Sequence, residues 1–319
     1  MGIYGGKREP NLTVHVATWN MNVQLPPEGL PPGMLRTGRE FGPEVDIYAV
    51  GVQEGGSAAQ LRGWVDLLGR ELGEDYVLVA QHNLGGMHLA VFMKRLVAQK
   101  CFEVRKDAVS CGIGNFMPNK GGVGIIAKVG STRLLFINAH LAAHQDRTKQ
   151  RNADYRRISA ELFRDVRPKR EPLESMAEAV FWFGDLNYRI RGNRRSIDCC
   201  VERRMMDVMR ANDSLMIERA AGNAFVDFSE GAINFLPTYK FDVGSDVYDT
   251  SQKQRVPSWT DRILYKVRAP CIPPSLPSFL PSFLPSFLPY TSPSKHLTHF
   301  QPSRPLVSET RLHTTHLPT

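Results

Sequence analysis

Residues 181–190 read FWFGDLNYRI, an aromatic run that leads directly into an aspartate and an asparagine. Three aromatic residues follow Ala179 and Val180 in a short apolar run, which predicts a buried strand. Gly184 ends the run, and Asp185 and Asn187 come directly after it. A buried approach that ends in an acid predicts a carboxylate held in place at the end of a strand.

Similar short runs, rich in β-branched or aromatic residues, recur along the first 266 residues. The predicted strands are 12–19, 46–53, 76–81, 89–94, 121–129, 133–141 and 179–186. Helices are predicted at Ser57–Leu72, Asp146–Val166 and Ser196–Ala211, and in the second of them apolar residues recur every three to four positions. Strands and helices that alternate in this way predict α/β layers around a sheet core, in one domain because no linker interrupts them.

The composition narrows the class of protein. The longest apolar runs are strand-sized and too short to span a membrane, and the N-terminus has no apolar signal core, so a cytoplasmic location is expected. Five cysteines without Cys-x-x-Cys spacing argue against a disulfide framework or a zinc site. The formal charge of +8 predicts an anionic partner: nucleic acid, a membrane surface or a phosphorylated small molecule.

Four polar clusters each follow a predicted strand, where α/β proteins usually place their sites. In chain order they contain Asn20 and Asn22, Glu54, His140 and His144, and Asp185 and Asn187. Taken singly, the first cluster is better explained by a turn and the second by an exposed acid. The His pair could bind zinc, although no third ligand is evident nearby. Together these oxygen and nitrogen donors suit a hard cation such as Mg²⁺, which keeps water ligands and binds substrate phosphate.

Lysines and arginines close to these clusters in the sequence would supply charge for a polyanion. They are Lys120, Lys149, Arg151, Lys240 and Arg255. The two glycines after Lys120 let backbone N–H groups approach a phosphate, although a tight hairpin turn explains this NKGG stretch equally well.

Seven motifs, in order, resemble the catalytic domain of the inositol polyphosphate 5-phosphatases, within the endonuclease/exonuclease/phosphatase superfamily. They are TWNMN, GVQE, NKGGVGI, NAHLAAHQ, FWFGDLNYRI, PTYKFD and RVPSWTDRILYK, between Leu12 and Lys266. The resemblance implies an α/β fold with a layered, DNase I-like β-sandwich flanked by helices. It also implies Mg²⁺-dependent removal of the 5-phosphate from phosphoinositide lipids or soluble inositol polyphosphates.

The resemblance further implies a role for each matching residue. Glu54, with Asn20 nearby, would bind Mg²⁺, and His140 would contact the scissile phosphate. Asp185, with Asn187 beside it, would orient and help deprotonate the attacking water. Four residues would grip the 4-phosphate: Tyr239, Lys240, Lys253 and Arg255. Lys120 would face the other end of the head group, and Phe116 and Met117 would provide peripheral membrane contact. Nucleic acid is not an expected partner, and a monomer is expected.

The sequence departs from the family after Lys266. The family continues with a Ser-Asp-His block whose His is oriented by the residue matching Asp261, and no Ser-Asp-His occurs in this chain. Residues 267–319 hold half of the 22 prolines and three consecutive PSFL repeats. Such a stretch predicts a disordered tail, and the repeat suggests translated intron sequence.

We therefore expect an N-terminal extension at 1–11, a catalytic domain at 12–266 with its C-terminal strands missing, and a low-complexity tail. Activity is expected to be impaired, because an acid/base residue contributes about 10²–10⁴-fold in rate. Two alternatives stay open. The chain could be a non-catalytic phosphoinositide-binding module, or a nuclease of the same superfamily, which the phosphatase-specific motifs disfavour.

Overall fold

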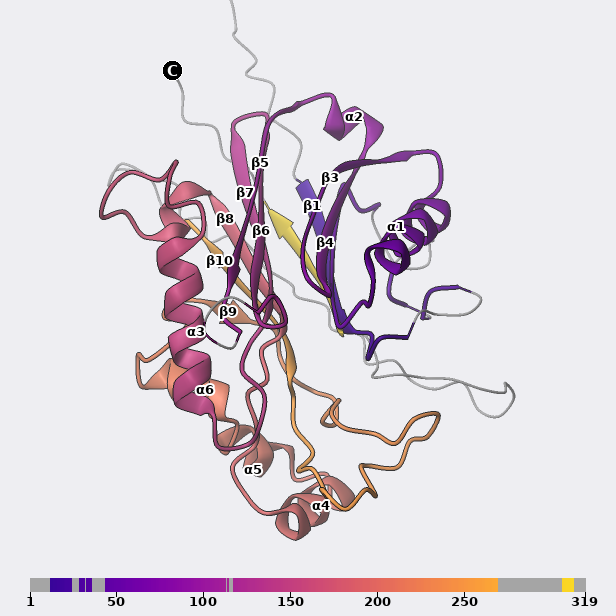
Figure 1. Ribbon diagram of the computed structural model, residues 1–319, viewed down its shortest axis with the longest axis vertical. Coiled ribbons are helices and arrows are strands. Elements are labelled where there is room, and N and C mark those ends of the chain that lie inside the picture. The colour runs from indigo at the N-terminus through magenta and orange to yellow at the C-terminus, as the bar shows by residue number, and fades with distance from the viewer. Residues whose placement is uncertain are drawn as a thin grey trace, which may run out of the picture.

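The structure is a computed structural model that describes residues 12–24, 29–31, 33–35, 44–112, 114, 117–268 and, as backbone only, 306–312. Two β-sheets pack face to face, with α1 outside one sheet and α3 and α6 outside the other (Figure 1). The predicted α/β layers are confirmed, in the form of a β-sandwich flanked by helices.

The first sheet has the strand order β11-β1-β2-β4-β3. Strands β1 and β2 run parallel, and the other neighbours are antiparallel. Its strands are β1 (Leu12–Asn20), β2 (Ile47–Gln53), β3 (Tyr76–Leu84), β4 (Met87–Lys94) and β11 (Leu306–Leu312).

The second sheet has the strand order β5-β6-β7-β8-β10-β9. Strands β7 and β8 run parallel, and the other neighbours are antiparallel. Its strands are β5 (Cys101–Ser110), β6 (Gly121–Val129), β7 (Thr132–His140), β8 (Ala179–Asp185), β9 (Ser229–Glu230) and β10 (Asp261–Val267).

Alternate residues of the strands fill the core between the sheets, since successive side chains of a strand point to opposite faces. Val14 and Val16 of β1 belong to this core together with Phe181 of β8 and Phe136 of β7. The rings of Phe136 and Phe181 stack with their centroids 5.3 Å apart. The interdigitated side chains fix the register of these strands, because a slip of one residue would exchange the side chains that face the core with those that face the helices.

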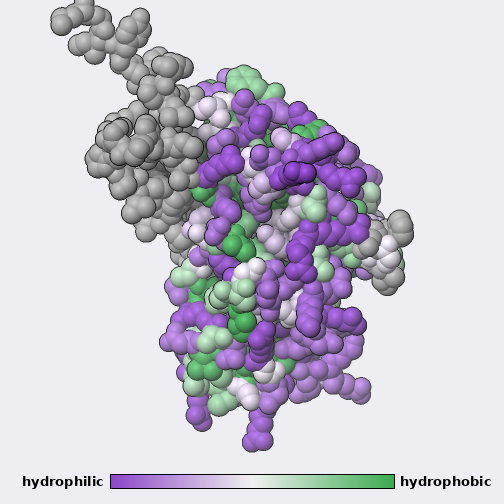
Figure 2. Space-filling model, turned by 90° about the vertical axis from the view of Figure 1, so that its left-hand side faces the viewer, coloured by the Kyte–Doolittle hydropathy of each residue, from purple (hydrophilic) through white to green (hydrophobic). Residues whose placement is uncertain are grey.

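Helices cover the outer faces of both sheets. Helix α1 (Ala58–Leu72) packs Trp64 and Leu68 against the first sheet and begins with a capping box between Ser57 and Gln60. Helix α3 (Thr148–Glu161) lies on the second sheet, and the molecular face on that side is largely hydrophilic (Figure 2). The remaining helices are α2 (Arg95–Ala98), η3 (Leu173–Met176), α4 (Arg194–Glu202), α5 (Met206–Ala211) and α6 (Ser214–Ala220). None of the helices in the described ranges has the length and apolar character needed to cross a bilayer.

Two predictions about elements need correction. The helix predicted at Ser196–Ala211 is two helices, α4 and α5, because Arg204 between them adopts a left-handed backbone with φ +51°. The tail predicted to be disordered contains β11, which pairs antiparallel with β1 from Leu12 to Thr18, so a strand fills that edge of the sheet (Figure 1). The rest of the tail beyond Arg268 lies outside the described residues.

Candidate active site

The strand pairing brings five polar residues to one end of the sandwich. In the first sheet β1 ends at Asn20, and Glu54 follows β2 directly. In the second sheet His140 is the register partner of Asp185, and Asp261 pairs with Asp185 from the other side of β8. Since both parallel strand pairs end on this side, the predicted clusters meet in space.

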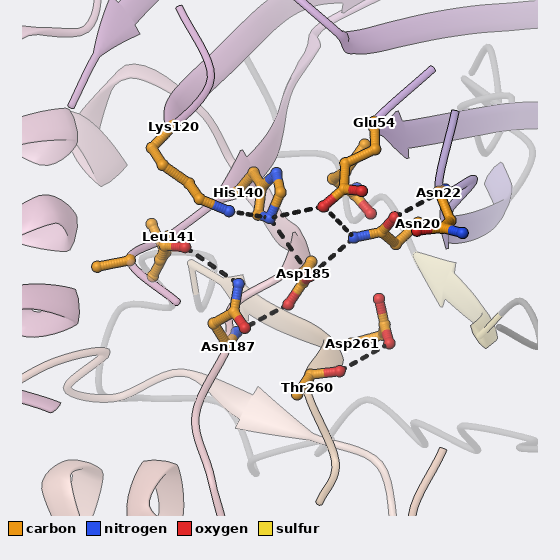
Figure 3. Close-up of polar contacts among 12 residues, drawn as sticks. Asn20, Asn22, Glu54, Lys120, His140, Leu141, Asp185, Asn187, Thr260 and Asp261 are labelled. Atoms are coloured by element: carbon orange, nitrogen blue, oxygen red, sulfur yellow. Dashed lines mark hydrogen bonds and ion pairs between the residues drawn. The ribbon is translucent and has the colours of Figure 1, made fainter. Parts of the chain in front are cut away.

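These side chains contact one another across the gap between the sheets (Figure 3). Asn20 Nδ2 donates to Glu54 Oε1 at 3.3 Å and to Asp185 Oδ2 at 3.0 Å. His140 Nε2 lies 3.4 Å from Asp185 Oδ2 and 3.9 Å from Glu54 Oε1. Lys120 Nζ also contacts His140 Nε2. Two carboxylates, an imidazole and an amine therefore share one site built from both sheets.

Hydrogen bonds from Asn187 hold the Asp185 side chain in place. Its backbone N–H donates to Asp185 Oδ1 at 3.1 Å, and its side-chain amide donates to the Leu141 carbonyl oxygen at 3.1 Å. Asn187 and Glu54 both adopt left-handed backbone conformations, with φ of +56° and +53°. Such conformations are costly for residues other than glycine and cluster at functional sites, where the surrounding structure enforces them.

The charges around Asp185 keep it ionised. Burial alone would raise its pKa, but the hydrogen bond and charge of His140, followed by the charges of Lys120 and Arg189, lower the pKa to about 2. Burial lowers the pKa of Lys120. Asp185 is thus a carboxylate at neutral pH and can accept a proton or a hydrogen bond from a bound group.

The pKa of Asp261 is shifted in the opposite direction from that of Asp185. Burial, followed by the charge of Asp185, raises its pKa well above the usual range of an aspartic acid. Its Oδ2 accepts a hydrogen bond from Thr260 Oγ1 at 3.0 Å, whereas Oδ1 has no hydrogen-bond partner within the described ranges. Asp261 therefore keeps an unused hydrogen-bonding position at the wall of the site.

The site opens into a cavity of about 260 Å³. Besides Lys120, its walls carry the cationic side chains of Arg189, Lys240 and Arg255. The guanidinium of Arg189 lies over the ring of Tyr239, 4.0 Å from its centroid. Cationic groups around carboxylates suit a phosphorylated ligand that binds together with a metal ion.

Most of the site residues predicted from the sequence line this cavity. They are Asn20, Asn22, Glu54, Lys120, His140, Asp185, Asn187, Tyr239, Lys240, Arg255 and Asp261. Met117 is exposed, just before Lys120 in the chain, and Phe116 lies outside the described residues.

Four predicted residues do not line the cavity. Lys149, Lys253 and His144 are exposed side chains elsewhere. Arg151, predicted as a source of charge for a polyanion, is completely buried and donates to the carbonyl oxygens of Ala142 and His144. Its role in the structure is to hold the loop after β7, because both of its terminal amino groups donate to carbonyl oxygens of that loop.

Arg189 is a cavity residue that the sequence analysis missed. It donates to Asn187 Oδ1 at 2.5 Å and is almost fully buried. Its position two residues after Asn187, inside the FWFGDLNYRI stretch, was a signal that could have identified it.

The donor groups of the site fit magnesium. Within the described ranges, no group of three or more His, Cys, Asp and Glu side chains is arranged to hold a metal ion. Mg²⁺ is usually bound by one or two carboxylates and completes its shell with water and substrate phosphate. Glu54 and Asp185, bridged by Asn20, offer that number of carboxylates, whereas a structural zinc site would need four protein ligands.

The fold and the site define a member of the endonuclease/exonuclease/phosphatase superfamily. The family described as Endonuclease/Exonuclease/phosphatase family 2 matches residues 17–281. The crystal structure of the inositol polyphosphate 5-phosphatase domain (IPP5C) of SPsynaptojanin, in complex with inositol (1,4)-bisphosphate and calcium ion, superposes with a TM-score of 0.76. It is 30% identical in sequence, and the match covers 95% of this chain and 84% of that one. The chain therefore belongs to this family and, within it, to the inositol polyphosphate 5-phosphatases.

Two relatives illustrate the similarity in sequence. Phosphatidylinositol polyphosphate 5-phosphatase type IV of Mus musculus is 36% identical over 81% of this chain and 41% of its own length. Type II inositol 1,4,5-trisphosphate 5-phosphatase of Mus musculus is 37% identical over 80% of this chain and 27% of its own length. The chain thus spans less than half of the length of either relative.

Proposed function

We propose that this chain hydrolyses the 5-phosphate of phosphoinositide lipids or soluble inositol polyphosphates, with Mg²⁺ as cofactor. The observation that carries the proposal is the convergence of Glu54, His140 and Asp185 in one cavity whose walls are cationic. The family membership and the inositol bisphosphate bound in the similar SPsynaptojanin domain support the same substrate class.

Each group in the cavity has a task in this reaction. Glu54 and Asn20 would hold Mg²⁺, which when bound polarises the phosphate and neutralises its charge. His140 would donate to the scissile phosphate, and Asp185, kept ionised by its neighbours, would orient the attacking water and take up its proton. Tyr239, Lys240 and Arg255 would bind the neighbouring 4-phosphate, and Lys120 the other end of the head group; Asn187, Arg189 and Asp261 would support these groups.

The test is phosphate release from inositol 1,4,5-trisphosphate, with ³¹P NMR to identify which phosphate leaves. We expect loss of the 5-phosphate in Mg²⁺, no release after chelation with EDTA, and a decrease in kcat of about 10²–10⁴-fold in Asp185→Asn. Release of a phosphate from another ring position, or no release from the wild type, would refute the proposed reaction.

One observation favours a second function, binding of the head group without turnover. Asp261 Oδ1 has no hydrogen-bond partner in the described part of the chain, so the group that the family places opposite this residue is not seen there. Titration calorimetry with the same trisphosphate separates the two functions. Binding without product release would identify a non-catalytic binding module.

We also propose that the cavity rim touches a membrane when the substrate is a lipid. Met117 near Lys120, Val243 in the cavity wall and Val247 in the same loop as Val243 are each about half exposed. Co-sedimentation with vesicles that contain phosphatidylinositol 4,5-bisphosphate tests this contact. Met117→Asp and Val247→Asp should weaken vesicle binding and leave hydrolysis of the soluble trisphosphate unchanged.

A further inference from the structure

A layer of buried polar side chains lies between the apolar core and the active site. On the inward faces of the strands, Val16 of β1 is followed by Thr18 and then Asn20, and Phe136 of β7 is followed by Asn138 and then His140. Thr18 and Asn138 are completely buried. Each therefore lies one step deeper in the sandwich than a residue of the site, because alternate residues of a strand share a face.

Gln53 completes this layer. It is completely buried, and Glu54 follows it directly. Its Nε2 donates to Thr18 Oγ1 at 3.0 Å within the first sheet and to Asn138 Oδ1 at 2.6 Å in the second sheet. The three side chains thus connect the two sheets at the level just below the site.

Asn138 makes most of the hydrogen bonds that connect the two sheets in this layer. Its Nδ2 donates to the carbonyl oxygens of Val52 at 3.0 Å and His88 at 2.9 Å, which belong to β2 and β4 of the opposite sheet. With the bond from Gln53, one side chain of the second sheet is held by three groups of the first. Apolar packing tolerates small displacements, whereas hydrogen bonds in a buried network restrict both distance and direction.

At Gly51, the backbone of β2 lies close to the Asn138 side chain. A Cβ atom added at Gly51 would lie 2.7 Å from Asn138 Cγ and 2.7 Å from a ring carbon of Phe183. Gly51 is therefore the residue that allows the sheets to approach closely here.

We propose that Asn138, together with Gln53 and Thr18, is a positioning element that sets the separation and register of the two sheets at the active site. Glu54 and Asn20 come from one sheet, and His140 and Asp185 come from the other. Their contacts of 3.0–3.9 Å thus depend on how the sheets are held. A displacement of about 1 Å at a catalytic site costs on the order of 10²-fold in rate.

The test compares three variants for Mg²⁺ affinity by calorimetry, and for kcat and KM on inositol 1,4,5-trisphosphate. Asn138→Leu removes the connection at similar volume, and Gly51→Ala keeps every polar group but forces the sheets apart. Phe136→Leu, in the apolar core away from the site, is the control for lost stability. All are measured well below their unfolding temperatures.

We expect Asn138→Leu and Gly51→Ala to weaken Mg²⁺ binding and lower kcat by about 10–100-fold, with a smaller change in KM. Phe136→Leu should lower the unfolding temperature and change neither the Mg²⁺ affinity nor kcat. If Asn138→Leu fails to fold, Gly51→Ala and Gln53→Met carry the comparison. Equal Mg²⁺ affinity in the wild type and in the folded variants of this layer would overturn the proposal.

The kcat measurement rests on the proposed function, whereas the Mg²⁺ affinity does not require turnover. If the wild type binds Mg²⁺ but releases no phosphate, only the proposed hydrolysis is refuted. The Mg²⁺ affinities of the variants would then still test whether Asn138 and its partners position the site. A wild type that turns over, with layer variants that behave like Phe136→Leu, would refute the positioning element alone.

Discussion

At the scale of single residues, the pKa of Asp261 has a consequence for stability. Burial and the charge of Asp185 raise this pKa above its ordinary value of 3.8, so the folded state binds a proton that the unfolded state has lost. The contribution of Asp261 is therefore most favourable at low pH and is lost as the pH rises from 3.8 through the folded-state pKa. Asp261→Asn removes this dependence. We expect it to raise the free energy of unfolding by about 1–3 kcal/mol at pH 7.5 and to change it little near pH 4.

Urea denaturation at both pH values measures this difference, with the exposed Asp75→Asn as the control. The same gain at pH 4 and pH 7.5 would show that the charge of Asp261 is not its cause.

Two lysines with the same predicted role are placed differently, and this leads to a second prediction. Lys240 lines the cavity, whereas Lys253 is exposed outside it. A hydrogen bond to a charged group contributes about 1.5–3 kcal/mol, so Lys240→Ala should raise KM for the trisphosphate about 10–100-fold. Lys253→Ala should change KM less than threefold, the range of a screened surface charge. Initial rates over a range of substrate concentrations give both values, and a larger effect at Lys253 would contradict the placement.

The sequence predicted which strand-end residues meet in the cavity better than it predicted the residues that come from loops or from inside the strands. Asn20, Glu54, His140 and Asp185 each follow a recognisable strand, so their position at a common edge could be inferred. Lys253 could not be placed, because it lies in an irregular loop whose path depends on tertiary contacts. Thr18, Asn138 and Gln53 were also not identified, since a polar residue inside a buried strand carries no sequence signal that separates it from an exposed one.

At the scale of elements, two glycines predict opposite effects of the same substitution. Gly184 in β8 has φ +133°, and a Cβ there would lie 2.0 Å from the carbonyl oxygen of Ala139 in β7. Gly184→Ala should therefore lower the free energy of unfolding by about 1–3 kcal/mol and lower kcat, because Asp185 is the next residue. Gly63 in α1 has open space around a Cβ. Gly63→Ala should raise stability by about 0.5–1 kcal/mol and leave kcat unchanged. Thermal unfolding and initial rates test both; a neutral Gly184→Ala would contradict the close strand contact.

Two of the features that the sequence predictions missed have separate physical causes. Strand β5 carries Glu103, Arg105 and Lys106 and lies at a sheet edge, where one face is exposed and the apolar pattern is weak. The break between α4 and α5 depends on the left-handed backbone of Arg204, and arginine gives no indication of a helix end. Helix α1 was predicted to its last residue because its capping box and apolar stripe agree.

At the scale of the whole molecule, the site exists only where the two sheets meet. Neither sheet alone contains both Glu54 and Asp185, so its geometry depends on the core that joins them. A change that shifts one sheet relative to the other at this end of the sandwich should therefore affect activity as well as stability.

Strand β11 provides the test of this dependence. It pairs with β1 from Leu12 to Thr18, and β1 ends at the site residue Asn20. Deletion of residues 306–319 leaves one edge of β1 without hydrogen-bond partners, although its side chains are buried on both faces. We expect a lower unfolding temperature, weaker Mg²⁺ binding and concentration-dependent association through the open edge, measured by calorimetry and light scattering. Deletion of 313–319 alone is the matched control, because the pairing ends at Leu312, and it should behave like the intact chain. Equal unfolding temperatures for both deletions would show that β11 does not support β1.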